Sequence, residues 1–140
     1  MEYIEANEFL NQNKEVQKVF LDWWTPSEGD LFMDVFDSGV IRIVSYYDEK
    51  LNYIIPFSRE FKSYISDCIP LFTEGQLREF IEEELGSVLD INHYESDGYS
   101  MYAIKGNKLI KKWEMLGCDL LQAYWKVAVK IAKEISWKIN

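Results

Sequence analysis

The chain has 140 residues, of which 48% are hydrophobic and 28% charged, a composition that is typical of a globular protein and excludes a disordered one. Its formal net charge of -9 argues against general nucleic-acid binding, because that affinity comes largely from neutralising phosphates. No run of apolar residues approaches the roughly 18 that a membrane span needs, and the acidic start is unlike a signal peptide. We therefore expect a cytoplasmic protein with no membrane partner, folded as a single domain over residues 1–140.

The charge is unevenly placed along the chain. Residues 1–100 contain 21 acidic and 7 basic residues, whereas residues 101–140 contain 3 acidic and 8 basic residues. An acidic body of this kind favours a basic protein partner, and it also serves solubility.

The predicted elements begin with a helix at residues 5–24. Large apolar residues recur there at helical spacing and share one face. They are Phe9, Val16, Val19, Phe20 and Trp23. Asn13 lies on the same face, which is compatible with a break at which Asn13 caps a second helix. A turn at residues 25–30 follows, because Pro26 and Gly29 both favour turns.

Three β-rich runs come next, and the short turns between them favour antiparallel pairing. The predicted strands are residues 31–36, 40–47 and 51–55, with turns at residues 37–39 and 48–50. Residues 57–71 contain apolar residues without a clean period, and we assign no element to them.

The next helix has well-marked ends. Thr73 and Gln76 form a capping-box pattern at its start, and Gly86 stops it. Strand signals then resume, with Asp97-Gly98 and Gly106-Asn107 as hairpin turns. The predicted strands are residues 88–94, 99–104 and 109–115.

The last helix, from Asp119 to about Ile135, has an apolar face wider than the roughly 100° stripe of a surface helix. We expect four of its apolar residues to be buried as the central packing element: Leu120, Tyr124, Ala128 and Ile131. The order is helix, three strands, helix, three strands, helix. The sequence thus predicts an α+β fold in which two three-stranded antiparallel meanders pack with three helices.

Three stretches of the sequence, taken together, carry a resemblance to a known group of proteins: DWWTPSEGDLF (residues 22–32), IPLFTEGQLREFIEEELG (residues 69–86) and DLLQAYWKVAVKIAKE (residues 119–134). They resemble small uncharacterised proteins encoded in phages and prophages of Gram-positive bacteria. The resemblance covers about a third of the chain. It implies a phage or mobile-element origin and a life in the host cytoplasm, and it brings no activity, cofactor or catalytic residue.

The sequence predicts no catalytic residue, cofactor or metal. His93 is the only histidine and lies inside a predicted strand, where a structural or surface role is the better interpretation. Cys68 and Cys118 lack metal-ligand spacing, and we expect reduced, buried, inert thiols. Gly-rich phosphate loops and nucleophile motifs are missing from the sequence, so we favour a protein that is not an enzyme.

A remote alternative is a metal-dependent nuclease. Its acids would be Glu28, Asp30, Asp34 and Asp37, followed by the pattern Asp48-x-Lys50. Carboxylates of this kind hold Mg²⁺ and position water. Asp48 and Lys50 fall in a predicted turn, however, where solvated charges are ordinary.

The candidate partner-binding residues are acidic or aromatic. They are Glu79, Glu82 and Glu83 on the middle helix, Glu28, Asp30 and Asp34 near the first strand, and Trp24. Trp23 and Trp24 would point about 100° apart on a helix, so both cannot lie in the central core. Core packing is the safer interpretation for Trp23, and Trp24 is the candidate for an exposed anchor, although the sequence leaves open which of the two is exposed. The plainer interpretation of the glutamates is a solvated helix face.

Our leading hypothesis is a small acidic interaction protein that binds a basic surface of a host protein. Its most concrete form is an anti-defence protein that occupies the basic nucleic-acid channel of a CRISPR-type nuclease. The alternative is a module that binds a nucleotide-like small molecule in a cleft lined by tyrosines, tryptophans and lysines. A lysine cluster on the last hairpin fits phosphate binding, or it protects a sheet edge: Lys105, Lys108, Lys111 and Lys112.

Overall fold

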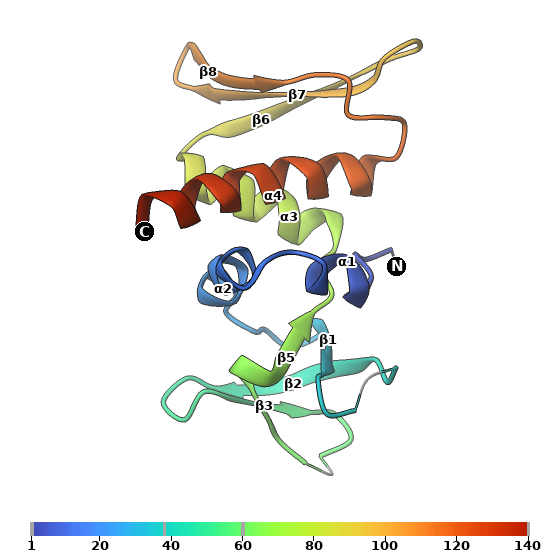
Figure 1. The fold of residues 1–140 in the computed structure, drawn as a ribbon, viewed down its shortest axis with the longest axis vertical. Helices are drawn as coiled ribbons and strands as arrows, with labels where there is room; N and C mark the ends of the chain where they lie inside the picture. Colours follow the sequence, from blue (N-terminus) through green and yellow to red (C-terminus); the bar gives the residue numbers. More distant parts are fainter. Residues whose placement is uncertain (1, 38, 60, 140) are drawn as a thin grey trace. The chain divides into compact units, whose positions relative to one another are not determined.

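The computed structural model describes residues 2–37, 39–59 and 61–139. The chain forms two compact units, an N-terminal unit (Glu5–Phe72) and a C-terminal unit (Thr73–Asn140 with Met1–Ile4). Each has its own helices and its own antiparallel sheet, which confirms the predicted α+β class (Figure 1). Ser38, which the sequence placed in a turn, lies outside the described residues.

The N-terminal unit opens with two helices, α1 (Ala6–Leu10) and α2 (Lys14–Trp23). The Oδ1 atom of Asn13 accepts a hydrogen bond from the Val16 N–H at 2.9 Å, so the break at this residue is confirmed as a helix N-cap. The buried ring of Phe20 lies 5.6 Å from the ring of Phe72, centre to centre, which ties α2 to the end of this unit.

A five-stranded sheet completes this unit. Its strands are β1 (Leu31–Asp34), β2 (Arg42–Asp48), β3 (Tyr53–Pro56), β4 (Ser63–Tyr64) and β5 (Cys68–Pro70), with a 3-10 turn, η1, at Ile65–Asp67. The order is β4-β3-β2-β1-β5, so the chain meanders through four strands and then returns beside the first.

The predicted three-stranded meander is therefore too small, because residues 57–71 supply β4 and β5. Neither strand could be recognised by periodicity. β4 has two residues, and all three residues of β5 are buried, so no alternation of polar and apolar residues marks them.

A β-bulge in β2 decides which side chains share a face of this sheet. Val44 pairs with Pro56, but Tyr46 pairs with Ile55, so Ser45 is the extra residue on β2. Side chains that are paired across antiparallel strands lie on the same face. Four buried residues accordingly define the inner face: Phe32, Val44, Ile54 and Ser63.

The C-terminal unit begins with α3 (Glu74–Leu85). The predicted capping box is confirmed, since the Thr73 N–H donates to Gln76 Oε1 at 3.0 Å and the Gln76 N–H donates to Thr73 Oγ1 at 3.4 Å. The predicted stop is confirmed too, because Gly86 adopts the left-handed conformation (φ 58°) at the end of the helix.

A three-stranded sheet and a long helix follow. They are β6 (Val88–Tyr94), β7 (Gly98–Lys105), β8 (Lys108–Trp113) and α4 (Leu120–Ile139), with strand order β6-β7-β8. α3 packs against α4 and β6, and α4 packs against β7, so the two helices cover one face of the sheet. Tyr124, Ala128 and Ile131 are buried as expected, whereas Leu120 is only half-buried. None of the helices in the described ranges has the length and apolar content that crossing a membrane demands.

Candidate functional site

Trp24 is not an exposed anchor, which corrects the prediction. Its side chain is only 4% exposed, and its Nε1–H donates to Asp30 Oδ2 at 3.1 Å. The helix ends at Trp23, and Trp24 has extended backbone angles, so the 100° spacing that assigned the two tryptophans does not apply to it. Trp23 is the half-exposed member of the pair, with its ring 5.9 Å from that of Phe72.

Asp30 and Asp34 also have internal roles. Asp30 Oδ2 accepts the Ser27 N–H at 2.9 Å in addition to the Trp24 indole. Asp34 is 7% exposed, and its Oδ1 accepts the Phe36 N–H at 2.8 Å, which fixes the turn after β1. Asp34 is therefore too buried to form part of an acidic surface, and of the three acids predicted near β1 only Glu28 is exposed.

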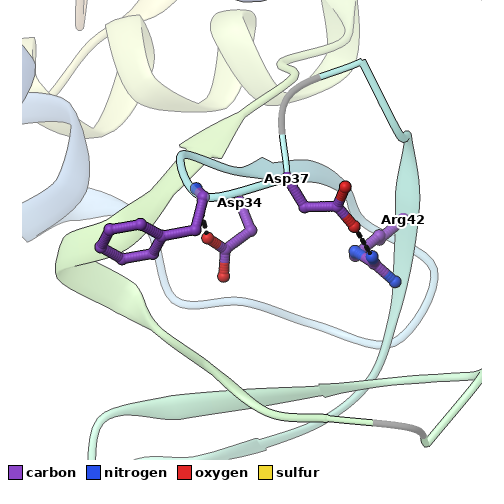
Figure 2. A network of polar contacts seen from close by, with 4 residues as sticks. Asp34, Asp37 and Arg42 are labelled. Atoms are coloured by element: carbon purple, nitrogen blue, oxygen red, sulfur yellow. Dashed lines mark hydrogen bonds and ion pairs between the residues drawn. The ribbon is translucent and has the colours of Figure 1, made fainter.

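Figure 2 shows the network around this turn. Asp37 forms an ion pair with Arg42, whose side chain is only 10% exposed. The guanidinium group of Arg42 lies over the ring of Phe61, 3.9 Å from its centre. The two connections that flank β2 and β3 are thus held together by one cation, and no pattern in the sequence indicated this role for Arg42.

The glutamates of α3 form the acidic face that the sequence predicted. Glu79 and Glu83 are exposed, and Glu82 is half-buried. Glu82 Oε2 accepts the Leu89 N–H at 2.8 Å, and Glu82 Oε1 lies 3.5 Å from Arg78 Nε. Burial, followed by the charge of Glu83, raises the pKa of the neighbouring Glu84. Glu82 therefore helps to hold β6 as well as contributing charge.

The histidine and the two thiols show no shared chemistry. The His93 ring packs against that of Tyr99, with 4.6 Å between their centres and a tilt of 57° between their planes. Cys68 is buried, its Sγ donates to the Tyr64 carbonyl at 3.3 Å, and burial, helped by Asp34 and Asp67, raises its pKa to about 12. Cys118 is exposed, contrary to our expectation, and both cysteines are free thiols.

The acids do not converge on a metal site. Within residues 2–37, 39–59 and 61–139, no group of three or more His, Cys, Asp or Glu side chains is placed to hold an ion. Asp48, the first residue of the proposed nuclease pattern, uses its Oδ1 to accept the Leu51 N–H at 3.0 Å in a turn.

The lysine cluster of the last hairpin is partly neutralised. Lys111 Nζ lies 2.6 Å from Glu134 on α4, and Lys112 Nζ lies 3.5 Å from Glu114. Lys105 and Lys108 face each other across the hairpin turn. The geometry is that of a charged strand edge more than of a phosphate cradle.

Each unit has a cleft lined by described residues. A cleft of about 300 Å³ lies between α2 and η1, and a cleft of about 270 Å³ lies beside the start of α3. The first is lined by Lys14, Gln17, Lys18, Leu21, Asp22, Ile65 and Ser66. Lys18 is already paired with Asp22 at 2.6 Å. Neither lining contains the tyrosines and tryptophans that a base-stacking pocket would use.

A further feature, which the sequence did not reveal, is the outer face of the N-terminal sheet. Strand register places a series of apolar and aromatic side chains there: Leu31, Met33, Ile43, Tyr46, Tyr53, Ile55, Phe57, Tyr64 and Ile69, the last of which is buried. Four of them, Ile43, Tyr46, Phe57 and Tyr64, are between 44% and 58% exposed. Only the bulge at Ser45 brings Ile43 and Tyr46 to the same side, so simple alternation could not have found this face.

The outer face is bordered by charged residues. The Lys62 ammonium group lies 4.6 Å from the centre of the Tyr53 ring, and Tyr53 packs edge-on against Tyr64. Asp48 ends the same strand as Tyr46, and Glu49 follows it in the turn. In the β1–β2 connection, Phe36 is 83% exposed, and the Asp34 carboxylate fixes its backbone.

Comparison of the chain with protein-family models, with curated proteins and with solved structures found no match.

Proposed function

We propose that the chain is a non-enzymatic interaction protein that binds another protein through the outer face of its N-terminal sheet. The observation that carries this proposal is the set of exposed apolar and aromatic side chains on paired strands, with Ile43, Tyr46 and Phe57 among them. A contiguous apolar patch exposed to water is typical of an interaction site, because covering it is favourable.

The partner that fits this face has an apolar centre and a basic rim. Tyrosines such as Tyr46 and Tyr64 suit an interface, since they combine a large apolar ring with a hydroxyl group. The N-terminal unit contains 12 acidic and 6 basic residues, and Asp48 and Glu49 lie at one end of the face. Opposite charge on the partner would steer its approach and fix its orientation.

Paired variants test this proposal. The double substitution Ile43→Asp with Tyr46→Asp places two charges on the outer face, while Leu10→Asp alters an exposed apolar residue on α1 of the same unit. Proteins captured from a bacterial host lysate by the wild type would be identified and purified, and their affinity measured directly. We expect the double variant to bind about thirtyfold or more weakly, because losing one hot spot costs about 2 kcal/mol.

The Leu10→Asp variant should keep its affinity, and thermal unfolding of both variants should show that the fold is retained. An affinity that is unchanged in the double variant would overturn the proposal. Self-association of the purified chain that the same double variant abolishes would also overturn it, because the face would then serve a second copy.

The narrower version of the proposal keeps the phage or prophage origin that the resemblance implies. In it, the partner is a host CRISPR-type nuclease whose basic nucleic-acid channel the acidic chain occupies. The net charge of -9 supports this version, because such channels bind phosphates through lysines and arginines. An excess of the protein should then block target-DNA binding by the purified nuclease. Unchanged DNA binding would rule out this version and leave the outer face to be tested separately.

A further inference from the structure

The edge of the C-terminal sheet at β6 is closed at one residue by α3. The Arg78 guanidinium donates to the Leu89 carbonyl at 2.8 Å, and the Leu89 N–H donates to Glu82 Oε2 at 2.8 Å. Arg78 and Glu82 are themselves an i,i+4 pair on α3. The pair thus occupies both backbone groups of Leu89 in the way that a neighbouring strand would.

The hydrogen bonds of Tyr99 on β7 show in which direction the backbone groups of His93 on β6 point. The Tyr99 N–H donates to the Gly117 carbonyl at 2.7 Å, and the Tyr99 carbonyl accepts from the Leu116 N–H at 2.9 Å. Tyr99 is the residue of β7 that pairs in register with His93. Because the N–H and C=O groups of Tyr99 are directed away from β6, they form no hydrogen bonds with the backbone of His93. The His93 N–H and C=O therefore point outward, away from β7.

Ile91 lies midway between these two residues. Because the backbone groups of an antiparallel strand alternate with a period of two, the N–H and C=O of Ile91 point outward like those of Leu89 and His93. α3 covers this edge at Leu89 and leaves Ile91 and His93 as an open stretch. Among the hydrogen bonds between described residues, none joins these outward groups to another segment.

The surroundings of this open edge are acidic. Asp90 and Glu95, both exposed, flank the open stretch on β6 and just after it. A segment that pairs with this edge would therefore gain from carrying lysine or arginine.

We infer that the open edge of β6 binds an extended, lysine- or arginine-containing segment of a partner protein as an added fourth strand. Main-chain hydrogen bonds to Ile91 and His93 supply the affinity, and Asp90 and Glu95 select the charge. The Arg78–Glu82 pair sets the register, because it prevents pairing at Leu89. This site lies in the C-terminal unit and is independent of the outer face of the N-terminal sheet.

Amide exchange and chemical shifts of the full chain, measured by NMR, test the inference. The probe is a synthetic peptide of alternating lysine and valine, and its matched control has glutamate in place of lysine. In the free protein the Ile91 and His93 amides should exchange fast, while those of Asp90 and Asn92, which face β7, should be protected. With the basic peptide at about ten times its Kd, exchange at Ile91 and His93 should slow about tenfold.

A backbone variant separates strand addition from mere charge attraction. His93→Pro removes an outward N–H, which an edge strand tolerates, and should abolish peptide binding with little loss of stability. Asn92→Pro removes an inward N–H that bonds to β7 and should destabilise the sheet instead. Charge reversal of Asp90 and Glu95 to lysine should transfer the preference to the glutamate peptide.

Several outcomes would overturn the inference. One is that the basic peptide leaves Ile91 and His93 unperturbed up to millimolar concentration, and another is that the glutamate peptide binds equally well. Retained binding in the His93→Pro variant would exclude backbone pairing. Concentration-dependent shifts at these two amides without peptide would show that the occupant is a second copy of the chain.

Discussion

The guanidinium group of Arg42 lies over the ring of Phe61, 3.9 Å from its centre, while the same group pairs with Asp37. Arg42 starts β2, Phe61 precedes β4 and Asp37 follows β1, so one side chain joins three segments of the N-terminal unit. The ion pair with Asp37 (Figure 2) and the contact with Phe61 together hold the β1–β2 and β3–β4 connections against the start of β2.

Replacing Arg42 by alanine should lower the free energy of unfolding by about 2–3 kcal/mol, because it removes a nearly buried cation from both a carboxylate and an aromatic ring. Lys62→Ala is the matched control, since Lys62 is exposed and lies 4.6 Å from the centre of the Tyr53 ring. Its loss should cost about 0.5 kcal/mol. Urea denaturation measures both values, and equal losses would contradict the role of Arg42.

The Trp24–Asp30 hydrogen bond should also contribute to stability. Asp30→Ala leaves the buried Trp24 indole N–H and the Ser27 N–H without their acceptor, so we expect a loss of about 1–3 kcal/mol. Glu28→Ala, two residues away and exposed, should change the unfolding free energy by less than about 0.5 kcal/mol. Denaturant titrations measure the unfolding free energy of both variants. Equal values for Asp30→Ala and Glu28→Ala would refute the stabilising role of the Trp24–Asp30 hydrogen bond.

Gly98 should tolerate no side chain. A Cβ atom at this residue would lie 2.2 Å from the Gly117 carbonyl oxygen, and its φ of +76° is unfavourable for other residues. We expect Gly98→Ala to destabilise the C-terminal unit by about 3 kcal/mol or more. Gly106→Ala, at φ +63° in open space, should cost only about 1 kcal/mol. Thermal unfolding compares the two, and a milder effect at Gly98 would be inconsistent with the close approach.

Cys68 and Cys118 should differ in reactivity. Burial, with help from Asp34 and Asp67, raises the pKa of the Cys68 thiol from 9.0 to about 12, whereas Cys118 is exposed. A thiol-specific reagent at mildly alkaline pH should therefore label Cys118 in the folded protein and Cys68 only after unfolding. Mass spectrometry of the labelled peptides decides this, and rapid labelling of Cys68 in the native state would disprove its burial.

The raised pKa of Cys68 also makes the free energy of unfolding depend on pH in the alkaline range. The folded state keeps the Cys68 proton that the unfolded state loses above about pH 9, so stability should fall between pH 9 and about 12. The slope from this group is at most about 1.4 kcal/mol per pH unit. Cys68→Ala should remove that part of the dependence, and identical pH profiles for the two proteins would contradict the assignment.

Local signals in the sequence predicted the elements whose ends depend on a few neighbouring residues. Asn13, Thr73 and Gly86 mark helix ends through bonds or conformations that each residue type favours by itself, and all three were confirmed. The buried side of α4 followed from helical spacing, apart from the half-buried Leu120. These predictions needed no knowledge of distant contacts.

The features that were missed depend on pairing between distant segments. β5 is recognisable only beside β1, because its three buried residues show no alternation. Asp34 looked like a surface acid, yet the chain fold buries it and turns it toward the Phe36 N–H. The open edge at Ile91 follows from the contacts of Tyr99 and Arg78, and neither contact is encoded in the residues of β6.

The extra residue at Ser45 has a consequence for how β2 can vary in length. Val44 and Tyr46 pair with consecutive residues of β3, so a chain without Ser45 would still place Ile43 and Tyr46 on one side and Val44 on the other. A deletion after Tyr46, where the pairing is regular, would turn the residues beyond it to the opposite side. Losing Ser45 would thus shorten β2 while Tyr46 stays on the solvent-facing side and Val44 stays in the core.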